Sequence, residues 1–473
     1  MRTRTHASLS SPRARRARAI RPLLALALLG ACDDPVVPNF NDPTLPAVPN
    51  AAELQGQVSG LVSGDREQHA FQILVMETMG RDAYRIDVAD PRYLDMPLGS
   101  FDPGAFLVDF TWNVRYRTIR SAQFLIQGVD ASEAFTDEQK AAARGVARTF
   151  QANQYIALIE SRDTLGLPIS LGIADTLAPI RCQPVVLEYI SALLDSAAAD
   201  LAAAGGAFPF ELPGGFDGFN TPATFLQFNR ALAAKVLTYR GFEDYRRSST
   251  VDADALNAAL ALLEPGQSFI NLNLSSTDSA ALHRGVYHVF STASGDLQNT
   301  NFDNSVHRAN PKVLPDLEPG DRRAAKIVEI DTLAKSNAAG TVQSDLLFMI
   351  VQGPTAPLPI INNVELILTQ AEVLWGLNRD GEALDLVNLV RQVDGGLGPK
   401  GAFADRLDLL REILRQKRLS LLWESGARFV DFRMLGLIPE LGTEQIRPGE
   451  EPEVIPFPQA EIDARGGNLT CAP

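Results

Sequence analysis

Apolar positions along the chain recur mostly at the spacing of an amphipathic helix, which predicts a mainly α-helical protein. The segment that follows Thr221-Pro222 shows the pattern clearly. One face of this helix would carry Phe225, Phe228, Leu232, Val236 and Tyr239. No segment alternates between apolar and polar positions over a length that would support a dominant sheet.

Start and stop signals divide this pattern into separate helices. Thr136-Asp137-Glu138-Gln139 is typical of a capping box, and it would open a helix that runs toward Glu160. Gln183-Pro184 and Thr221-Pro222 place proline in a first helical turn, where its missing N–H is not needed. The helix that starts at Gln183-Pro184 would end at Gly205-Gly206.

Long irregular stretches interrupt the helices. Residues 81–103 mix aromatic residues with aspartates and prolines, residues 207–220 are rich in Gly, Phe and Pro, and residues 264–359 have weak periodicity. Long loops inside a compact domain are uncommon unless they carry function. We therefore expect the binding surface of the protein to be built from these stretches.

Two consecutive helices are predicted within residues 360–435, which also hold the C-terminal signature described below. The first would present Val364, Leu368, Ala371 and Trp375 on one face, and the second would present Ala383, Val387 and Val390. A small residue such as Ala371 lets two antiparallel helices approach closely. The pair matches a tetratricopeptide repeat loosely, so the expected fold is a tetratricopeptide-like helical scaffold with long loop insertions.

The N-terminal segment has the composition of an export signal. Residues 1–21 contain seven arginines and no acidic residue, and residues 23–29 are an apolar run too short to span a bilayer. The run ends in Leu29-Gly30-Ala31-Cys32, which resembles a bacterial lipobox. We therefore predict a lipoprotein signal peptide over 1–31, with Cys32 as the lipidated residue. The alternative is an ordinary signal peptide with a cysteine nearby.

The segment after Cys32 and the charge of the whole chain add two expectations. Prolines recur over residues 32–50, which favours an extended tether ahead of a single domain over 51–473. The chain carries a net charge of −14, which becomes more negative once the signal arginines are removed. Such an acidic protein is a poor partner for nucleic acid or for an anionic bilayer surface.

Two cysteines remain if Cys32 carries lipid. Cys182 and Cys471 would then lie in a compartment that permits disulfides. A bridge between them would hold the C-terminal tail against the body. The alternative is a pair of unpaired thiols, and the sequence leaves the choice open.

Four segments in the C-terminal part resemble, in order, the signature of the SusD/RagB family of outer-membrane nutrient-binding lipoproteins. They are ELILTQAE at 365–372, GEALDLVNLVR at 381–391, EILRQKRLSLLWESGARFVDFR at 412–433 and IPFPQAEI at 455–462. Residues 147–155 and 164–169 resemble the family's N-terminal helix and the segment after it. Gln416 replaces a usual acidic residue and Ser425 is inserted, which marks the chain as a divergent member.

This resemblance implies a lipid-anchored protein at the cell surface that serves a TonB-dependent transporter of the SusC type. It would capture oligosaccharide, or in some cases peptide, without a cofactor. Aromatic rings stack on sugar rings, so the irregular stretches and their flanks supply the candidate ligand contacts. These candidates are Trp112, Tyr84, Tyr93, Phe101, Tyr287 and Phe302, each of which could instead pack in the core.

Motifs for catalysis and metal binding are missing from the sequence. It has no HExxH, CxxC, G-x-S-x-G or phosphate-loop pattern, and the spacing of His283 and His288 does not suit a metal site on a helix. Glu424 and Arg428 would pair across a helical turn if the helix continues through Gly426. We therefore expect no enzyme. The alternative function is an exported tetratricopeptide-like scaffold that binds another protein and no small ligand.

Overall fold

The computed structural model describes residues 48–169, 171, 177–336, 342–442 and 452–473. Residues from Ala47 onward form one compact unit. The predicted signal peptide, Cys32 and most of the predicted tether lie outside the described residues. Within the described residues, no helix is long and apolar enough to cross a membrane.

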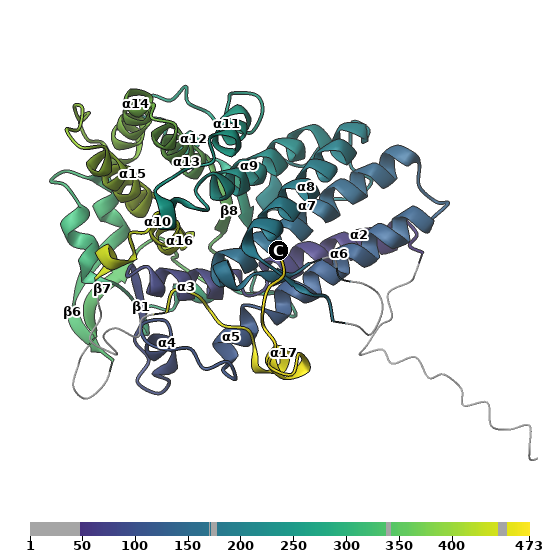
Figure 1. Cartoon of the computed structure of the whole chain (residues 1–473), viewed down its shortest axis with the longest axis horizontal. Coiled ribbons are helices and arrows are strands. Elements are labelled where there is room, and N and C mark those ends of the chain that lie inside the picture. The colour runs from purple at the N-terminus through teal and green to yellow at the C-terminus, as the bar shows by residue number, and fades with distance from the viewer. Residues whose placement is uncertain (1–47, 170, 172–176, 337–341, 443–451) are drawn as a thin grey trace, which may run out of the picture. The chain divides into compact units, whose positions relative to one another are not determined.

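Helices dominate the structure, as the sequence predicted (Figure 1). The helices are α2 (Ala51–Arg66), α3 (His69–Met79), α4 (Arg92–Asp95), α5 (Phe106–Phe110), α6 (Asn113–Ala131), α7 (Asp137–Arg162), α8 (Gln183–Ala203), α9 (Pro222–Gly241), α10 (Tyr245–Ser248), α11 (Ala253–Leu262), α12 (Ser279–Leu282), α13 (Asn363–Gly376), α14 (Asp380–Val390), α15 (Arg406–Ser420), α16 (Ala427–Met434) and α17 (Gln459–Ala464). Shorter turns of helix are η1 (Asp163–Leu165), η2 (Gly214–Phe216), η3 (Thr300–Phe302), η4 (Pro311–Asp316), η5 (Arg322–Lys326), η6 (Arg391–Gly395) and η7 (Ile438–Leu441).

Strands occur only in pairs within the described residues, so the expectation of no dominant sheet is confirmed there. Each pair is antiparallel: β1 with β5, β2 with β3, β4 with β8, and β6 with β7. The strands are β1 (Ala83–Arg85), β2 (Leu167–Pro168), β3 (Ile180–Arg181), β4 (Gly285–His288), β5 (His307–Ala309), β6 (Ile327–Lys335), β7 (Gln343–Phe348) and β8 (Leu358–Asn362).

Successive long helices pack against one another in an array. α6, α7, α8 and α9 lie side by side in Figure 1, and each contacts the next along the chain. The predicted capping box opens α7: Thr136 Oγ1 accepts from Gln139 N at 3.3 Å, while Gln139 Oε1 accepts from Thr136 N at 3.0 Å. Such a box satisfies two backbone donors that the helix leaves without partners, so it fixes where α7 begins.

The predicted helix pair is α13 and α14, and α13 also packs against α9, α11 and α15. Every residue of α13 is buried. The apolar face predicted for α13 therefore covers only part of its buried surface. The helix forms the centre of the C-terminal half.

The condition for pairing Glu424 with Arg428, a helix that continues through Gly426, is not met. α15 ends at Ser420 and α16 begins at Ala427, because Gly426 has a left-handed φ of +67°. Arg428 Nη1 instead lies 2.9 Å from Asp82 Oδ1, and Glu424 lies 3.7 Å from Lys326 Nζ. The break turns α16 toward α3, against which it packs.

The C-terminal tail returns to the start of α8. Cys182 and Cys471 form a disulfide with a Cα–Cα distance of 4.9 Å. Backbone hydrogen bonds flank it, since Ala472 N donates to Ile180 O at 2.9 Å and Cys182 N donates to Ala472 O at 3.0 Å. The tail is therefore held by covalent and hydrogen bonds together.

Candidate functional site

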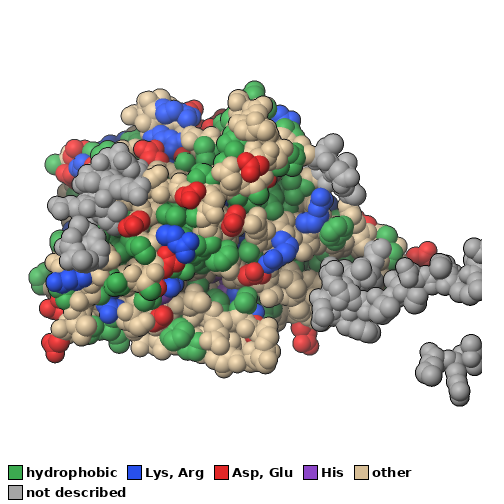
Figure 2. Space-filling view, turned by 90° about the horizontal axis from the view of Figure 1, so that it is seen from below, with side chains coloured by type: hydrophobic (Ala, Val, Ile, Leu, Met, Phe, Trp, Pro, Cys, Tyr) green, Lys and Arg blue, Asp and Glu red, His purple; other side chains and the backbone are tan. Residues whose placement is uncertain are grey.

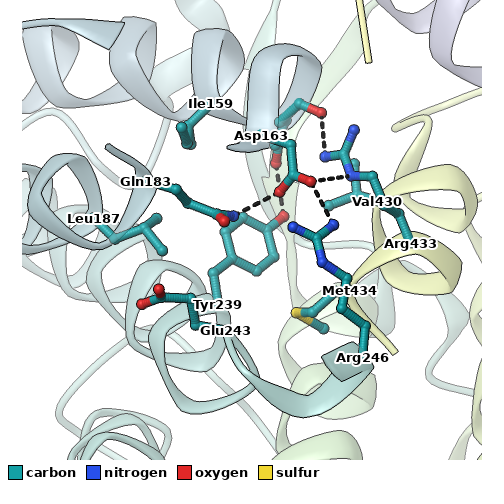
Figure 3. Close-up of a pocket in the computed structure, with 11 residues that line it drawn as sticks. Ile159, Asp163, Gln183, Leu187, Tyr239, Glu243, Arg246, Val430, Arg433 and Met434 are labelled. Atoms are coloured by element: carbon teal, nitrogen blue, oxygen red, sulfur yellow. Dashed lines mark hydrogen bonds and ion pairs between the residues drawn. The ribbon is translucent and has the colours of Figure 1, made fainter. Parts of the chain in front are cut away.

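A small cavity between α7, α8, α9 and α16 is lined by a group of polar side chains (Figure 3). Asp163 accepts a hydrogen bond from Gln183 Nε2 at 2.6 Å and lies 3.3 Å from Arg433 Nε. The hydroxyl of Tyr239 donates to Glu160 Oε1 at 2.7 Å. Burial raises the pKa of that hydroxyl well above its ordinary value, and Glu160 adds to the shift.

These polar groups form hydrogen bonds and ion pairs with one another. Arg246 also pairs with Asp163, and Arg433 Nη2 donates to the Glu160 carbonyl at 2.7 Å. The cavity has a volume of about 30 Å³, which is room for about two water molecules. Because most of these polar groups pair with one another and the cavity is small, they join neighbouring helices and offer little to a ligand.

A second polar group lies deeper, where α13, α15 and α16 meet. Lys417 Nζ lies 2.9 Å from Glu372 and 3.0 Å from Asp431, and all three side chains are buried. Burial and the neighbouring Asp431 raise the pKa of Glu372 to about 8. Burial alone would lower the pKa of Lys417, but the neighbouring Asp431 and Glu372 outweigh it and raise that pKa. Because the group is closed to solvent, it fits a structural role.

An aromatic patch lies on the surface, and we define it by Phe71, Tyr93, Phe106 and Phe110. Tyr93 and Phe106 have ring centroids 5.2 Å apart, and Phe106 and Phe110 have centroids 5.5 Å apart. Phe71 of α3 lies beneath, 5.5 Å from Phe110. Phe106 and Phe110 share one side of α5 because they are four residues apart. Phe110 is 39% exposed, whereas Tyr93 and Phe106 are half-buried.

Charged side chains border the aromatic patch. The Arg85 guanidinium lies 3.7 Å from the centroid of Tyr93, and that of Arg92 lies 4.6 Å from the centroid of Phe106. Asp90 accepts from Arg92 Nε at 2.8 Å and Nη2 at 2.7 Å, and these hydrogen bonds lower its pKa. α4 and α5 lie low in Figure 1, and the view from below in Figure 2 shows hydrophobic side chains interspersed with charged ones.

The patch can therefore offer a ring face and polar groups to the same ligand. Aromatic rings bury much apolar area with defined geometry. The neighbouring guanidinium and carboxylate groups supply directed hydrogen bonds. This combination suits a ligand with apolar faces and a polar rim.

Three of the six predicted aromatic contacts lie in the core. Trp112 is 5% exposed, and its ring packs edge-on against Phe457 with centroids 5.2 Å apart. Tyr84 and Phe101 are also buried among apolar side chains. We correct the expectation for these three residues: the folded chain covers their rings, so no face is open to a ligand.

The other three predicted contacts reach the surface, but at different places. Tyr93 belongs to the aromatic patch, and the half-buried Tyr287 lines a different cavity, beside α2. Phe302 is 36% exposed on η3.

The two neighbouring histidines have different partners, since His283 contacts Asp394 and His288 contacts Asp65. Among the described residues, no cluster of His, Cys, Asp and Glu could hold a metal ion.

Sequence reasoning missed Phe106, Phe110 and the two arginines of the patch. Their signal was present, because Phe106 and Phe110 follow the predicted loop directly at helical spacing. Spacing alone does not tell whether such a pair faces the core or solvent. In the folded chain Phe106 and Phe110 of α5 contact Phe71 of α3, and Phe110 remains exposed at the edge of this contact.

The comparisons with known proteins find similarity in structure alone. No protein-family profile matches the chain, and no curated protein matches its sequence. A SusD superfamily protein from Bacteroides vulgatus superposes with a TM-score of 0.66 over 90% of this chain and 98% of that chain, at 12% identity. A SusD-like carbohydrate binding protein from Bacteroides fragilis gives a TM-score of 0.60 over 82% and 87%, at 17% identity. A structure with xylogluco-oligosaccharide gives 0.60 over 82% and 84%, at 15% identity. The chain therefore has the fold of the SusD superfamily, which confirms the fold class that its C-terminal motifs indicated.

Proposed function

We propose that this protein is a cell-surface lipoprotein that binds oligosaccharide at the aromatic patch and delivers it to a TonB-dependent outer-membrane transporter of the SusC type. Binding involves no catalysis and no cofactor. The observation that carries the proposal is the exposed ring of Phe110, which packs against Phe106, the ring over which Arg92 of the Arg92–Asp90 pair lies. A sugar ring can stack on such a face while its hydroxyls bond the charged groups.

Two of the similar structures support carbohydrate as the ligand class. One is described as a carbohydrate binding protein and another was solved with xylogluco-oligosaccharide. The lipid anchor at Cys32 rests on the lipobox-like sequence, and the transporter partner rests on the family resemblance. The anchor and the transporter are therefore proposals in their own right.

The rival reading, a scaffold that binds only another protein, has less support. A tetratricopeptide array binds partners along a surface that its helices leave open. Here α13, the first helix of the predicted pair, is buried along its whole length by other parts of the same chain. This burial favours the ligand-binding function.

The proposal is tested by titrating xyloglucan and malto-oligosaccharides into the full chain in mild detergent. Phe110→Ala removes the open ring and should weaken the binding of a recognised oligosaccharide at least tenfold, about 1.4 kcal/mol. Phe124→Ala is the matched control, because Phe124 is 50% exposed on α6 and does not belong to the patch. An equal loss in both variants, or none in Phe110→Ala, would refute the proposed site.

A further inference from the structure

A larger cavity lies between α2, the segment that follows α8, and β4, and we call it the α2–β4 cavity. Its volume is about 340 Å³, at the lower end of the range of about 300–1,000 Å³ typical of ligand pockets. Ser59, Ser63 and Arg66 line it from α2, Glu211 from the segment after α8, and Tyr287 from β4. None of these residues belongs to the aromatic patch.

Main-chain hydrogen bonds fix the walls of this cavity. Gln55 Oε1 accepts from Glu211 N at 2.7 Å, and Gln55 Nε2 donates to Glu211 O at 3.1 Å. At the other end of α2, Arg66 Nη1 donates to the Val289 carbonyl and Arg66 also pairs with Asp296. The cavity is therefore formed before any ligand enters, so little ordering is required on binding.

Buried side-chain nitrogens in the wall, among them Nδ1 of His288 and Nε of Arg66, lack a hydrogen-bond partner among the described residues. His288 lines the cavity and is 1% exposed. Its Nε2 lies 2.9 Å from Asp65 Oδ2, whereas its Nδ1 has no hydrogen-bond partner among the described residues. Buried polar atoms in folded proteins are rarely left unpaired, so a ligand or a water molecule in the cavity is a candidate partner for these nitrogens.

We propose that the α2–β4 cavity is a second binding site, which takes one or two neutral sugar units. Asp296 neutralises Arg66, so the wall favours a neutral ligand over an anion. The hydroxyls of Ser59 and Ser63 and the exposed carboxylate of Glu211 can bond ligand hydroxyls, and the half-buried ring of Tyr287 supplies an apolar face. The ligand class rests on the proposed function, but the site does not depend on the aromatic patch.

The test is isothermal titration calorimetry of the full chain in mild detergent. The probes are glucose, galactose, mannose, xylose, maltose, cellobiose and lactose. Ser59→Phe fills the cavity from an exposed position, and Ser196→Phe is its control at an exposed position of α8. Glu211→Gln, which removes an exposed charge, provides a second variant if Ser59→Phe does not fold by circular dichroism.

At least one probe should bind saturably and lose tenfold or more in affinity in Ser59→Phe, and threefold or more in Glu211→Gln. Ser196→Phe and Phe110→Ala should bind that probe like the unchanged chain. The proposal is overturned if no probe binds, or if affinity survives in the cavity variants. Loss only in Phe110→Ala would assign the probe to the patch. If every variant binds long oligosaccharides like the unchanged chain, the aromatic patch is refuted as a site, and the result for the cavity still stands.

Discussion

At the residue scale, the buried group of Glu372, Lys417 and Asp431 has one positive charge for two carboxyl groups. Burial raises the pKa of Glu372 to about 8, so this carboxyl group keeps its proton at neutral pH. Glu77 behaves alike, because burial and the neighbouring Asp82 raise its pKa to about 8. Both groups titrate near 4.5 in the unfolded chain. Their contribution to stability is therefore complete below that pH and disappears as pH rises through 8.

This sign gives a prediction for Glu372→Gln, which keeps the shape of the neutral acid and removes its titration. Between pH 7 and 9 the free energy of unfolding should fall by about 1 kcal/mol more in the unchanged chain than in the variant, because only the unchanged chain releases the proton of Glu372. Urea unfolding at pH 7, 8 and 9 measures the difference. Glu382→Gln on the surface of α14 is the control and should follow the unchanged chain.

His69 and His307 do not obscure this measurement. Burial lowers the pKa of His69 to about 3 and that of His307 to about 4, so both bind protons on unfolding only below about pH 6.5. Their contribution to stability is lost as pH falls, in a separate window. Parallel pH profiles for Glu372→Gln and the unchanged chain would show that Glu372 is ionised in the folded protein.

At the element scale, the junction of α15 and α16 depends on Gly426. Its φ of +67° is a region that side chains other than glycine adopt at a cost of about 1–2 kcal/mol. A Cβ atom there would also lie 2.5 Å from the Cβ of Met76 in α3. Gly426→Ala should therefore destabilise the protein by about 2–4 kcal/mol, measured by chemical denaturation.

Gly381→Ala is the matched control for this junction. Gly381 lies in α14 with nothing within 4 Å of its would-be Cβ, so alanine should leave stability unchanged or raise it by about 0.5–1 kcal/mol. Equal stability of Gly426→Ala and the unchanged chain would mean that α16 can reorient without loss.

The contrast between these elements explains what the sequence could predict. Helix starts such as the one at Thr136 depend on residues three positions apart, so a short stretch of sequence is enough to predict them. The break at Gly426 depends on Met76, and Arg428 pairs with Asp82, 346 residues away. No local pattern contains these contacts, so the sequence alone leaves open whether the helix continues through Gly426.

The candidate site follows the same division. Tyr93 was predicted because irregular stretches with aromatic residues often carry function. Trp112 was predicted for the same reason, but Phe457 from the C-terminal segment covers its ring. Which aromatic residues reach the surface is decided by segments distant in sequence, so the region of the patch could be inferred but not its members.

At the scale of the whole molecule, the described body and the N-terminal segment have separate roles in the proposal. The body carries both candidate sites, and Cys32 would attach it to a membrane. A lipid chain anchors a protein through buried methylene groups and requires no membrane-spanning helix. Cys32→Ser should therefore move the protein from the membrane fraction to the soluble fraction after cell breakage and centrifugation, and should abolish incorporation of labelled palmitate.

Cys182→Ser is the cysteine control, because Cys182 is bonded within the body and should not affect anchoring. The same membranes then test the partner by pull-down through a C-terminal tag in mild detergent. A large β-barrel transporter should copurify with the unchanged chain and decrease strongly with Cys32→Ser, because anchoring concentrates both proteins in one membrane. Cys32→Ser that stays labelled and membrane-bound would refute the anchor. Labelled, membrane-bound protein that recovers no barrel would keep the anchor and refute the transporter, since the two proposals rest on different parts of the chain.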